Sequence, residues 1–419
     1  MRLLSRLFGF APNTRPARGA QLLRFRPRAE VLEDRTVPAF LRVDPNFPFF
    51  FPTIQSAINF AHPGDIIAVD QATYNEDIVI NKQLTLLGQG NSNGFPSIKG
   101  PGAAGAENIV RIADGVSGVV LNGFDIQSPN GTAKFQVGVS IGVGDANIAI
   151  TNNSIHDVRD ATRAVGGGTL TAGILINPKA RNLQIRNNQF SNILYSTQGV
   201  GSGGQTAFGI FSFSVSPLDG QNTVVISSNA FTNIGDIAIA ADDASQHITI
   251  DNNSITNVVG LRRGEGIEVA GPNGTPANVL ITHNMVTGVA GGQPVGVLIG
   301  GSATGVSMQF NTITGISGGV GMSLETTGVV TVIINLFTNN AIGIALTPSF
   351  SGILKLTANN ISGNSVAGLF NASGKHINAE LNWWGSATGP TNPANPFGIG
   401  DRVFGNVDFF RFLFAPITF

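Results

Sequence analysis

Short runs of alternating apolar and polar residues recur along most of this chain. Each run places two apolar residues on either side of one other position, then an Asn, then another apolar residue two positions further on. Alternation over so few residues has the period of a β-strand rather than the 3.6-residue period of a helix. The copies with the Asn are IAITNNSI, LQIRNNQF, VVISSNAF, ITIDNNSI, VLITHNMV, VSMQFNTI, VTVIINLF, LKLTANNI and INAELNWW; LTLLGQG and VVLNGFDI are earlier copies without it.

The shared Asn sets the length of the repeat. Its last three intervals are 24, 24 and 23 residues, which indicates a bare coil of about 24 residues. A strand of three residues cannot bury its apolar face alone, whereas coils stacked about 4.8 Å apart bury it against their neighbours. The sequence therefore predicts an all-β chain: a right-handed parallel β-helix, or solenoid, of about eleven coils with a short N-terminal capping helix.

The Asn residues predict a ladder along this stack. Asn tolerates the left-handed conformation of a turn, and its amide can donate to the next Asn along the stack, so we expect the ladder to fix the register of the coils. The residues of this structural ladder are Asn153, Asn188, Asn229, Asn253, Asn284, Asn311, Asn335, Asn359 and Asn382.

A second marker, Gly-apolar-X-apolar, lies 14 to 20 residues before each Asn and predicts another strand of the coil. It reads GVSI, GILI, GIFS, GIEV, GVLI, GMSL, GIAL and GLFN, with DIAI as the exception, where we expect Asp236 to replace the Gly. The third position of the motif faces outward in this interpretation. It places Glu268 one coil from Ala238.

The chain divides into four segments. Residues 1–39 are Arg/Pro-rich and are expected to be removed or flexible, and residues 40–65 are expected to form an N-terminal cap with a helix at 53–61 and Thr53 as its N-cap. The β-helix is expected over residues 66–385. Residues 386–419 are assigned to a C-terminal cap together with Trp383 and Trp384, because a solenoid must shield its open apolar ends.

The end motifs carry a resemblance to a known superfamily. TIQSAINFAHPGDIIAVDQATYNEDIVINKQLTLLGQG resembles the first coil, and LNWWGSATGPTNPANPFGIGDRVFGNVDFFRFL the terminal cap, of right-handed parallel β-helix proteins of the pectate-lyase-like superfamily. The resemblance covers about residues 50–415. The superfamily's catalytic elements, among them Gly-His-Gly and Arg-Pro-X-X-Arg, do not occur here, so no catalytic set can be carried over.

Composition and charge argue against several classes of binding partner. The net charge is -1, which gives no global field to attract nucleic acid, and the absence of Cys excludes disulfides and thiol chemistry. The sequence contains no run of 18 apolar residues, so no membrane span is predicted. Residues 1–35 carry eight Arg and three acids, and RPRAEVLEDRTVPA resembles an N-terminal signature of exported proteins of planctomycete-type bacteria. The resemblance implies an extracellular or cell-surface protein.

Excess length marks a candidate groove. It falls after the third apolar column and before the Gly strand, at about residues 158–172, 194–207, 259–265 and 289–294, so we expect these insertions to wall one corner. The alternatives are neutral loop growth for the insertions and a solvated, salt-bridged rim for the charges. The candidate groove residues are Arg159, Asp160, Phe211, Asp236, Asp242, Asp243, Arg262, Arg263, Glu265 and Glu268.

Two functions remain open at this point. The favoured one is non-catalytic binding of an extracellular or surface polysaccharide, or a rigid surface module. The alternative is a polysaccharide lyase, hydrolase or epimerase in which paired carboxylates act as acid and base. No cofactor is expected, with Ca²⁺ conceivable only for a lyase. Phe211 could stack on a sugar or form a satellite core, and the five His residues are interpreted as structural or surface residues.

Overall fold

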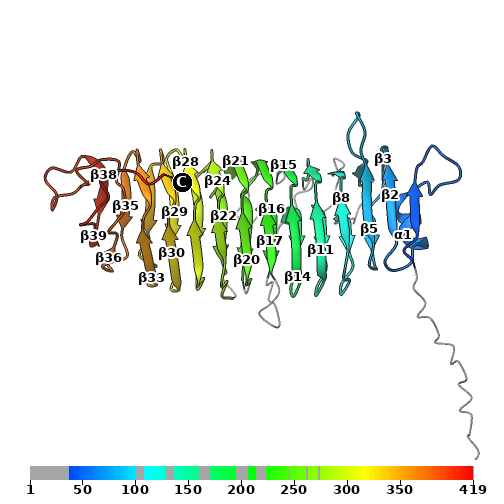
Figure 1. The fold of residues 1–419 in the computed structure, drawn as a ribbon, viewed down its shortest axis with the longest axis horizontal. Coiled ribbons are helices and arrows are strands. Elements are labelled where there is room, and N and C mark those ends of the chain that lie inside the picture. Colours follow the sequence, from blue (N-terminus) through cyan, green and yellow to red (C-terminus); the bar gives the residue numbers. More distant parts are fainter. Residues whose placement is uncertain are drawn as a thin grey trace, which may run out of the picture. The chain divides into compact units, whose positions relative to one another are not determined.

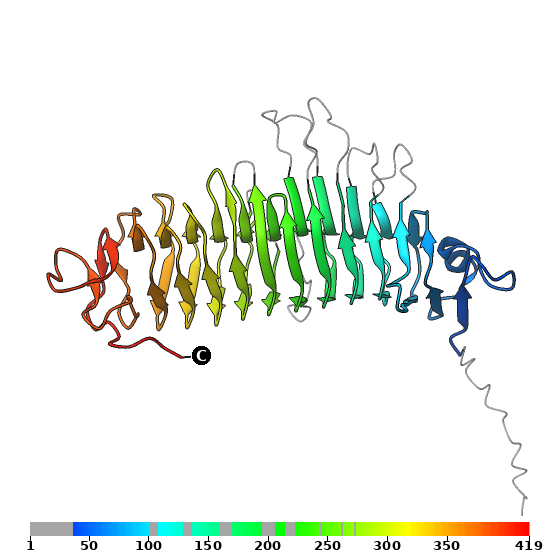
Figure 2. The ribbon, with the colours of Figure 1, turned by 90° about the horizontal axis from the view of Figure 1, so that it is seen from above.

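The structure is a computed structural model that describes residues 37–100, 108–128, 136–159, 170–194, 206–213, 223–243, 245–260, 263–271 and 274–418. Most of the regular structure there is β, and the only α-helix of the described residues is α1 (Ile54–Phe60). Successive strands visit three long parallel sheets in turn (Figures 1 and 2). Of the N-terminal segment expected at residues 1–39, residues 1–36 lie outside the described residues.

We call the three sheets A, B and C. Sheet A has 12 strands, in the order β1 (Phe40–Val43), β2 (Ile66–Asp70), β5 (Thr85–Gln89), β8 (Val120–Asn122), β11 (Ala146–Thr151), β14 (Arg181–Arg186), β17 (Val224–Ser227), β20 (Ile248–Asp251), β23 (Leu280–Thr282), β27 (Val306–Gln309), β30 (Val329–Ile333) and β33 (Ile353–Thr357). Sheet B has 12 strands, of which all but β25 follow one another in the order β3 (Thr73–Tyr74), β6 (Ser97–Lys99), β9 (Asp125–Gln127), β12 (Ser154–His156), β15 (Gln189–Ile193), β18 (Ala230–Ile234), β21 (Ser254–Gly260), β24 (Met285–Thr287), β28 (Thr312–Thr314), β31 (Leu336–Thr338) and β34 (Asn360–Ser362).

Sheet C completes each coil. Its 13 strands follow the order β4 (Ile78–Ile80), β7 (Asn108–Ile112), β10 (Gln136–Ile141), β13 (Leu170–Ile176), β16 (Thr206–Phe213), β19 (Ile237–Asp242), β22 (Glu265–Ala270), β26 (Val295–Ile299), β29 (Val320–Leu324), β32 (Ile342–Leu346), β35 (Ala367–Asn371), β38 (Gly400–Phe404) and β37 (Pro390–Thr391). β25 (Ala290–Gly291) pairs with β21, and β36 (Ile377–Asn378) pairs with β39 (Val407–Asp408). The three sheets, with 12, 12 and 13 strands, are consistent with the expected number of about eleven coils plus the strands of the two ends.

The core lies between the three sheets. Ile148 and Ile150 of β11 and Ile155 of β12 are buried with their counterparts in every neighbouring coil, which gives the three expected inward columns. Aromatic residues stack within the third column, where the ring centroids of Phe190 and Phe231 lie 4.7 Å apart. Each coil therefore buries its apolar residues mainly against the coils before and after it.

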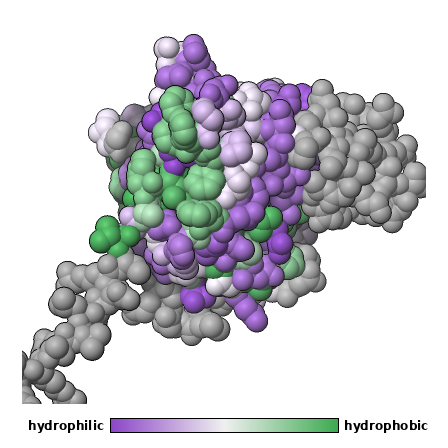
Figure 3. All heavy atoms as spheres, turned by 90° about the vertical axis from the view of Figure 1, so that its right-hand side faces the viewer, coloured by the Kyte–Doolittle hydropathy of each residue, from purple (hydrophilic) through white to green (hydrophobic). Residues whose placement is uncertain are grey.

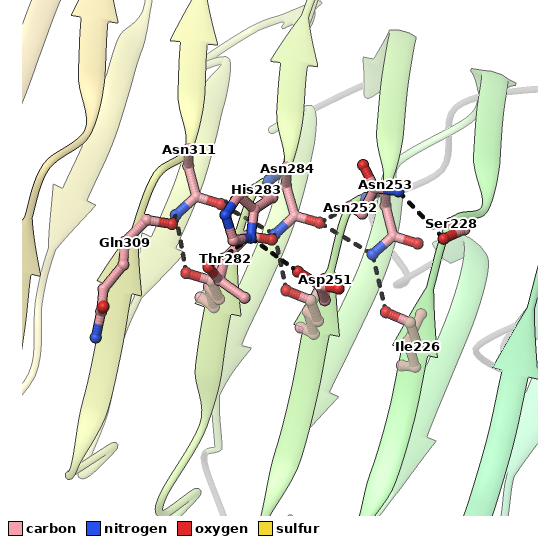
Figure 4. Close-up of polar contacts among 12 residues, drawn as sticks. Ile226, Ser228, Asp251, Asn252, Asn253, Thr282, His283, Asn284, Gln309 and Asn311 are labelled. Carbon is pink, nitrogen blue, oxygen red and sulfur yellow. Dashed lines mark hydrogen bonds and ion pairs between the residues drawn. The ribbon is translucent and has the colours of Figure 1, made fainter. Parts of the chain in front are cut away.

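The nine Asn residues form the expected ladder, part of which Figure 4 shows. Asn253 Nδ2 donates to Asn284 Oδ1 at 2.9 Å, and the backbone N–H of Asn253 donates to the same oxygen at 3.0 Å. Asn253 Nδ2 also donates to the carbonyl of Ile226 in the preceding coil. All nine side chains are at most 2% exposed, and the same contacts repeat along the stack. In the coil before Asn153, Phe124 takes the ladder position and donates its N–H to Asn153 Oδ1.

The expected left-handed conformation falls on a different residue. Positive φ angles occur one residue before the ladder Asn, at Asn152, Asn187, Ser228, Asn252, His283, Phe310, Ile334, Ala358 and Leu381. The ladder residue itself must keep its amide inside the coil, so its predecessor makes the turn. The prediction that the ladder Asn adopts this conformation was therefore wrong by one position.

A second, shorter ladder was not foreseen. Asn340 Oδ1 accepts from the N–H of Ile316, and Asn364 Oδ1 accepts from the N–H of Asn340. Asn364 Nδ2 in turn donates to Asp401 Oδ2 at 2.7 Å, so the carboxylate of the C-terminal cap ends this ladder. It satisfies backbone groups at the corner between sheets B and C in the last coils.

The N-terminal cap has the expected helix. Thr53 Oγ1 accepts from the N–H of Ser56, and the carboxylate of Glu76 accepts from the first two N–H groups of α1. The cap leaves apolar surface exposed, which Figure 3 shows at this end of the body, and Phe40, Phe49 and Phe60 are largely exposed. The helix thus covers the first coil without making the end polar.

Sheet C corrects the register expected for DIAI. Phe208 pairs with Ile237 and Ile210 with Ile239, so Ala238 rather than Asp236 stands opposite Gly209 in the Gly column. A Cβ at Gly209 would lie 2.5 Å from the carbonyl oxygen of Ala238, which shows how tightly this column packs. Asp236 lies before the strand.

Candidate functional site

The outer face of sheet C carries a continuous column of side chains. Strand register gives the order Arg111, Ser140, Leu175, Phe211, Ala240, Glu268, Leu298, Ser323, Ala345 and Phe370. Glu268 thus lies beside Ala240, and the expectation that it neighbours Ala238 was wrong. A second outward column contains Phe213, Asp242 and Ala270.

Phenylalanines form an apolar platform on this face. Phe208 and Phe211 stack with ring centroids 4.4 Å apart, and Phe213 lies 6.0 Å from Phe211. Phe211 packs against a second cluster, separate from the main core, that includes Phe208 and Ile237, as the satellite-core interpretation expects. The Phe213 side chain remains 39% exposed, so the edge of the platform is open to solvent.

Three carboxyl groups lie immediately beyond the platform. Asp242 ends β19 directly opposite Phe213, and Glu265 and Glu268 lie on β22 in the next coil. Glu265 is only 3% exposed, and its Oε2 atom and the Oδ1 atom of Asp242 are buried without a hydrogen-bond partner. Buried polar atoms are usually satisfied, so two unpartnered carboxyl oxygens in one cluster are unusual.

Burial and mutual repulsion change the protonation of this cluster. Desolvation, then Glu268 and Asp243, raises the pKa of Asp242 to about 9. Desolvation and Glu268 raise the pKa of Glu265 to about 9. Desolvation raises the pKa of Glu268 to about 7, while Arg263 opposes the shift. Burial therefore favours the neutral form of all three carboxyl groups, and it does so least strongly at Glu268, beside Arg263.

Arg263 connects the cluster to a residue that the sequence analysis missed. Its Nη2 lies 2.6 Å from Glu325 Oε1, two coils away, and its Nε lies 3.3 Å from Glu265 Oε1. Ser323 Oγ also donates to Glu325 Oε1. Extending the motif GMSL by one residue, to the second outward column, would have identified Glu325.

The remaining candidates separate into three groups. Asp160 and Arg262 lie outside the described residues. Asp236 and Asp243 act on the cluster electrostatically, since each raises the pKa of a neighbouring acid. Arg159 lies 3.9 Å from Asp157 at its Nη2 atom, so its described partner belongs to sheet B's corner rather than to the acids.

The ring of His156 contacts two carboxylate groups, unlike that of a solvent-exposed surface His. Its Nε2 lies 2.6 Å from Asp125 Oδ1, and its Nδ1 lies 2.8 Å from Asp157 Oδ2. The hydrogen bond to Asp125, with that to Asp157, raises the pKa of His156 to about 9. This group lies on sheet B and is separate from the sheet C cluster.

The described residues include His, Asp and Glu, whose side chains can bind metal ions. No group of three or more His, Asp or Glu side chains there is arranged to hold a metal ion. In the described parts of the chain, no helix is long and apolar enough to cross a membrane.

Insertions in the sequence occur between strands of sheets B and C and also between strands of sheets C and A. Residues 160–169, 195–205 and 261–262 fall between strands of sheets B and C, as the one-corner expectation requires. Residues 214–222, however, follow β16 and precede β17, so extra length also occurs between sheets C and A. The expectation of a single corner was incomplete.

Comparisons with known proteins bear on the fold. A family model described as "Right handed beta helix region" matches residues 217–383, in agreement with the architecture, so the chain is a right-handed parallel β-helix. No curated protein matches the sequence.

Three solved structures are similar to this chain at a low level. The Azotobacter vinelandii mannuronan C-5 epimerase AlgE4 A-module is 15% identical, with 76% of this chain and 90% of that chain covered and a TM-score of 0.44. Endo-xylogalacturonan hydrolase from Aspergillus tubingensis is 13% identical, with coverages of 88% and 100% and a TM-score of 0.38. Tailspike protein 3 of bacteriophage CBA120 is 11% identical, with coverages of 81% and 61% and a TM-score of 0.32. Similarity at this level carries no argument about function.

Proposed function

We propose that this protein binds a linear polysaccharide along the outer face of sheet C, between β16 and β29. The observation that carries the proposal is the pair of buried, unpartnered carboxyl oxygens, Glu265 Oε2 and Asp242 Oδ1, directly beside the phenylalanine platform. Sugars present apolar C–H faces and hydroxyl groups together. A site with an apolar floor and a few convergent polar groups suits such a ligand.

The repeating coils favour a polymer over a compact ligand. Equivalent side chains recur at about 4.8 Å along the column, so groups on successive coils stand at fixed spacing. Phe213 and Asp242 occupy neighbouring positions of one column, and Glu268 lies in the next coil. A chain lying along the column would contact the platform and the acids in sequence.

Cleavage of the bound chain is the second candidate. It is favoured by the separation of the pKa values, about 9 for Asp242 and about 7 for Glu268. Neighbouring carboxyl groups with separated pKa values can serve as acid and base at neutral pH. In that reaction Asp242 would donate a proton to the leaving oxygen, and ionised Glu268 would take a proton from the water molecule that attacks the anomeric carbon.

The test combines a glycan-array screen with an assay for released reducing ends. We expect binding of at least one linear polysaccharide, and Glu268→Gln and Asp242→Asn should weaken it. Asp251→Asn is the matched control, because Asp251 lies on sheet A and pairs with His283. Reducing-end release by the parent, abolished in Glu268→Gln, would establish the catalytic candidate. Failure to bind any glycan would overturn the proposal and favour a rigid surface module.

We also propose that the protein is exported. Support comes from the Arg-rich segment 1–35 and its resemblance to an export signature. Fractionation of cells that produce the full chain, with a variant lacking residues 2–36 as control, should place only the full chain outside the cytoplasm. Recovery of both proteins in the cytoplasm would contradict export.

A further inference from the structure

A cavity of about 310 Å³ opens on the outer face of sheet C, several coils before the acid cluster. It lies across β7, β10 and β13, and its walls include Asn108, Arg111, Asp114, Ser140, Leu175 and Asn177. The floor is apolar at Leu175, and the rim combines a guanidinium group with amide, hydroxyl and carboxyl groups. None of these residues belongs to the groove candidates found from the sequence.

Arg111 is the available cation of this cavity. Its side chain is exposed and makes no hydrogen bond or ion pair with a described residue, whereas the neighbouring polar groups are held in place. Asn177 Nδ2 donates to Ser140 Oγ at 3.2 Å and to the carbonyl of Ile141 at 2.8 Å. Asp114 Oδ1 accepts from the N–H of Val143 at 3.1 Å. The guanidinium fork of Arg111 is thus free to pair with a planar anion.

Strand register ties this cavity to the acid cluster. Arg111 stands in the same outward column as Glu268, five coil steps away through Ser140, Leu175, Phe211 and Ala240. Five steps correspond to about 24 Å at the spacing of neighbouring strands. The intervening positions are mainly apolar, so a chain could pass from one site to the other over the phenylalanine platform.

We infer that the Arg111 cavity is an end subsite that takes an anionic substituent of the same glycan chain, a carboxylate or a sulfate, about 24 Å from the acid cluster. This inference rests on the proposed function. The cavity lining holds Asp114 as well as Arg111, one charge of each sign, so recognition depends on the bidentate fork and on hydroxyl contacts rather than on a net positive field. Only chains long enough to reach both sites gain from the subsite.

The experiment measures the affinity of the full chain for acidic oligosaccharides of increasing length, from disaccharide to decasaccharide. Oligogalacturonates supply carboxylates, chondroitin sulfate oligosaccharides supply sulfates, and carboxyl-reduced oligogalacturonates are the neutral probe. We expect Kd to fall sharply once a chain spans the two sites. Arg111→Gln should then raise the Kd for long acidic chains about tenfold to a hundredfold and leave the Kd for short chains unchanged.

The control is Arg186→Gln, because Arg186 is exposed on sheet A, away from this face. Equal affinities of the Arg111 and Arg186 variants for long acidic chains would overturn the inference while leaving the proposed function intact. Loss of affinity for neutral and acidic chains alike in Arg111→Gln would also overturn it, since the subsite would then not read charge. Absence of glycan binding by the parent would overturn the proposed function and this inference together.

Discussion

The turn before each ladder Asn shows where single residues conflict with the fold. The left-handed position carries Asn in three coils but Ile334 at φ 55° and Phe310 at φ 57° in the second half. A β-branched residue in this conformation is strained, because its Cβ approaches the following carbonyl, at a cost of roughly 1–2 kcal/mol. The coil tolerates Ile334 because its backbone N–H and carbonyl are bonded to neighbouring coils.

Replacement of Ile334 by Asn should therefore stabilise the protein. Asn adopts the left-handed region more readily, and we expect a gain of about 1 kcal/mol, measured as a rise in the thermal unfolding midpoint. The control is Ile333→Asn, one residue earlier, which has no positive φ angle and should give no gain. Equal midpoints for parent and Ile334→Asn would show that the neighbours relieve the strain.

The Gly column shows why sequence alone misplaced one residue. Alternation with a period of two is unchanged by a shift of two residues, so DIAI and AIAA satisfy the apolar pattern equally well. The choice is made by packing, because this column approaches the carbonyl of the next coil too closely for a large side chain. The sequence therefore predicted the ladder and the inward columns but could not fix which outward residue neighbours Glu268.

At the level of elements, sheet B contains a charge arrangement that links neighbouring coils. His156 of β12 bridges Asp125 of β9 and Asp157, and its side chain is 23% exposed. Its pKa rises from 6.5 to about 9 because the protonated ring is bonded to both carboxylates. A raised pKa means that the folded state binds the proton more tightly, so the stabilisation is complete below pH 6.5 and is lost as pH rises to about 9.

His156→Gln should remove that stabilisation. We expect the variant to be less stable than the parent by about 2–3 kcal/mol at pH 6, with the difference vanishing near pH 9. Chemical denaturation at several pH values measures it. His283→Gln is the control, because the His283 side chain is 58% exposed beside Asp251. A difference between parent and His156→Gln that does not vary with pH would indicate lost packing rather than a lost ion pair.

The acid cluster of sheet C has the opposite relation to stability. The pKa of Asp242 is about 9 in the fold against 3.8 ordinarily, so the fold must keep this group protonated as pH rises above 4. The resulting cost grows between pH 4 and about 9, because the unfolded chain loses its proton and the folded chain retains it. A cluster that destabilises its own sheet is typical of a functional site.

Asp242→Asn should accordingly stabilise the fold while weakening the proposed glycan binding. We expect a gain of roughly 1–3 kcal/mol at pH 8 and little difference at pH 4, where the acid is neutral in both states. Thermal unfolding at the two pH values measures it. Asp251→Asn should give no comparable gain. Destabilisation by Asp242→Asn at pH 8 would show that the carboxyl group serves the fold.

At the level of the whole molecule, the chain is a stack of similar coils, each of which contacts mainly the coil before and the coil after it. The sequence predicted this organisation well, because an Asn ladder and three apolar columns over nine copies leave few alternatives. It predicted the site less well, because outward positions carry no periodic signal: Glu325 and Arg111 stand alone among unlike neighbours. Residues without counterparts in other coils can be assigned to a site only after the strand register shows which outward column they occupy.

The stack also predicts that one whole coil can be removed. Deletion of residues 336–359 joins Asn335 to Asn360, which occupies the position after the ladder Asn, and lets Asn382 replace Asn359 as the acceptor for Asn335. Because each coil contacts mainly its neighbours, we expect a cooperatively folded β protein with a slightly lower unfolding midpoint. Deletion of only residues 336–347 removes half a coil and should abolish cooperative unfolding, since every later apolar residue loses its column. Glycan affinity should survive the full-coil deletion, because β16 to β29 precede it, whereas its loss would mean that the ligand extends over the second-half coils.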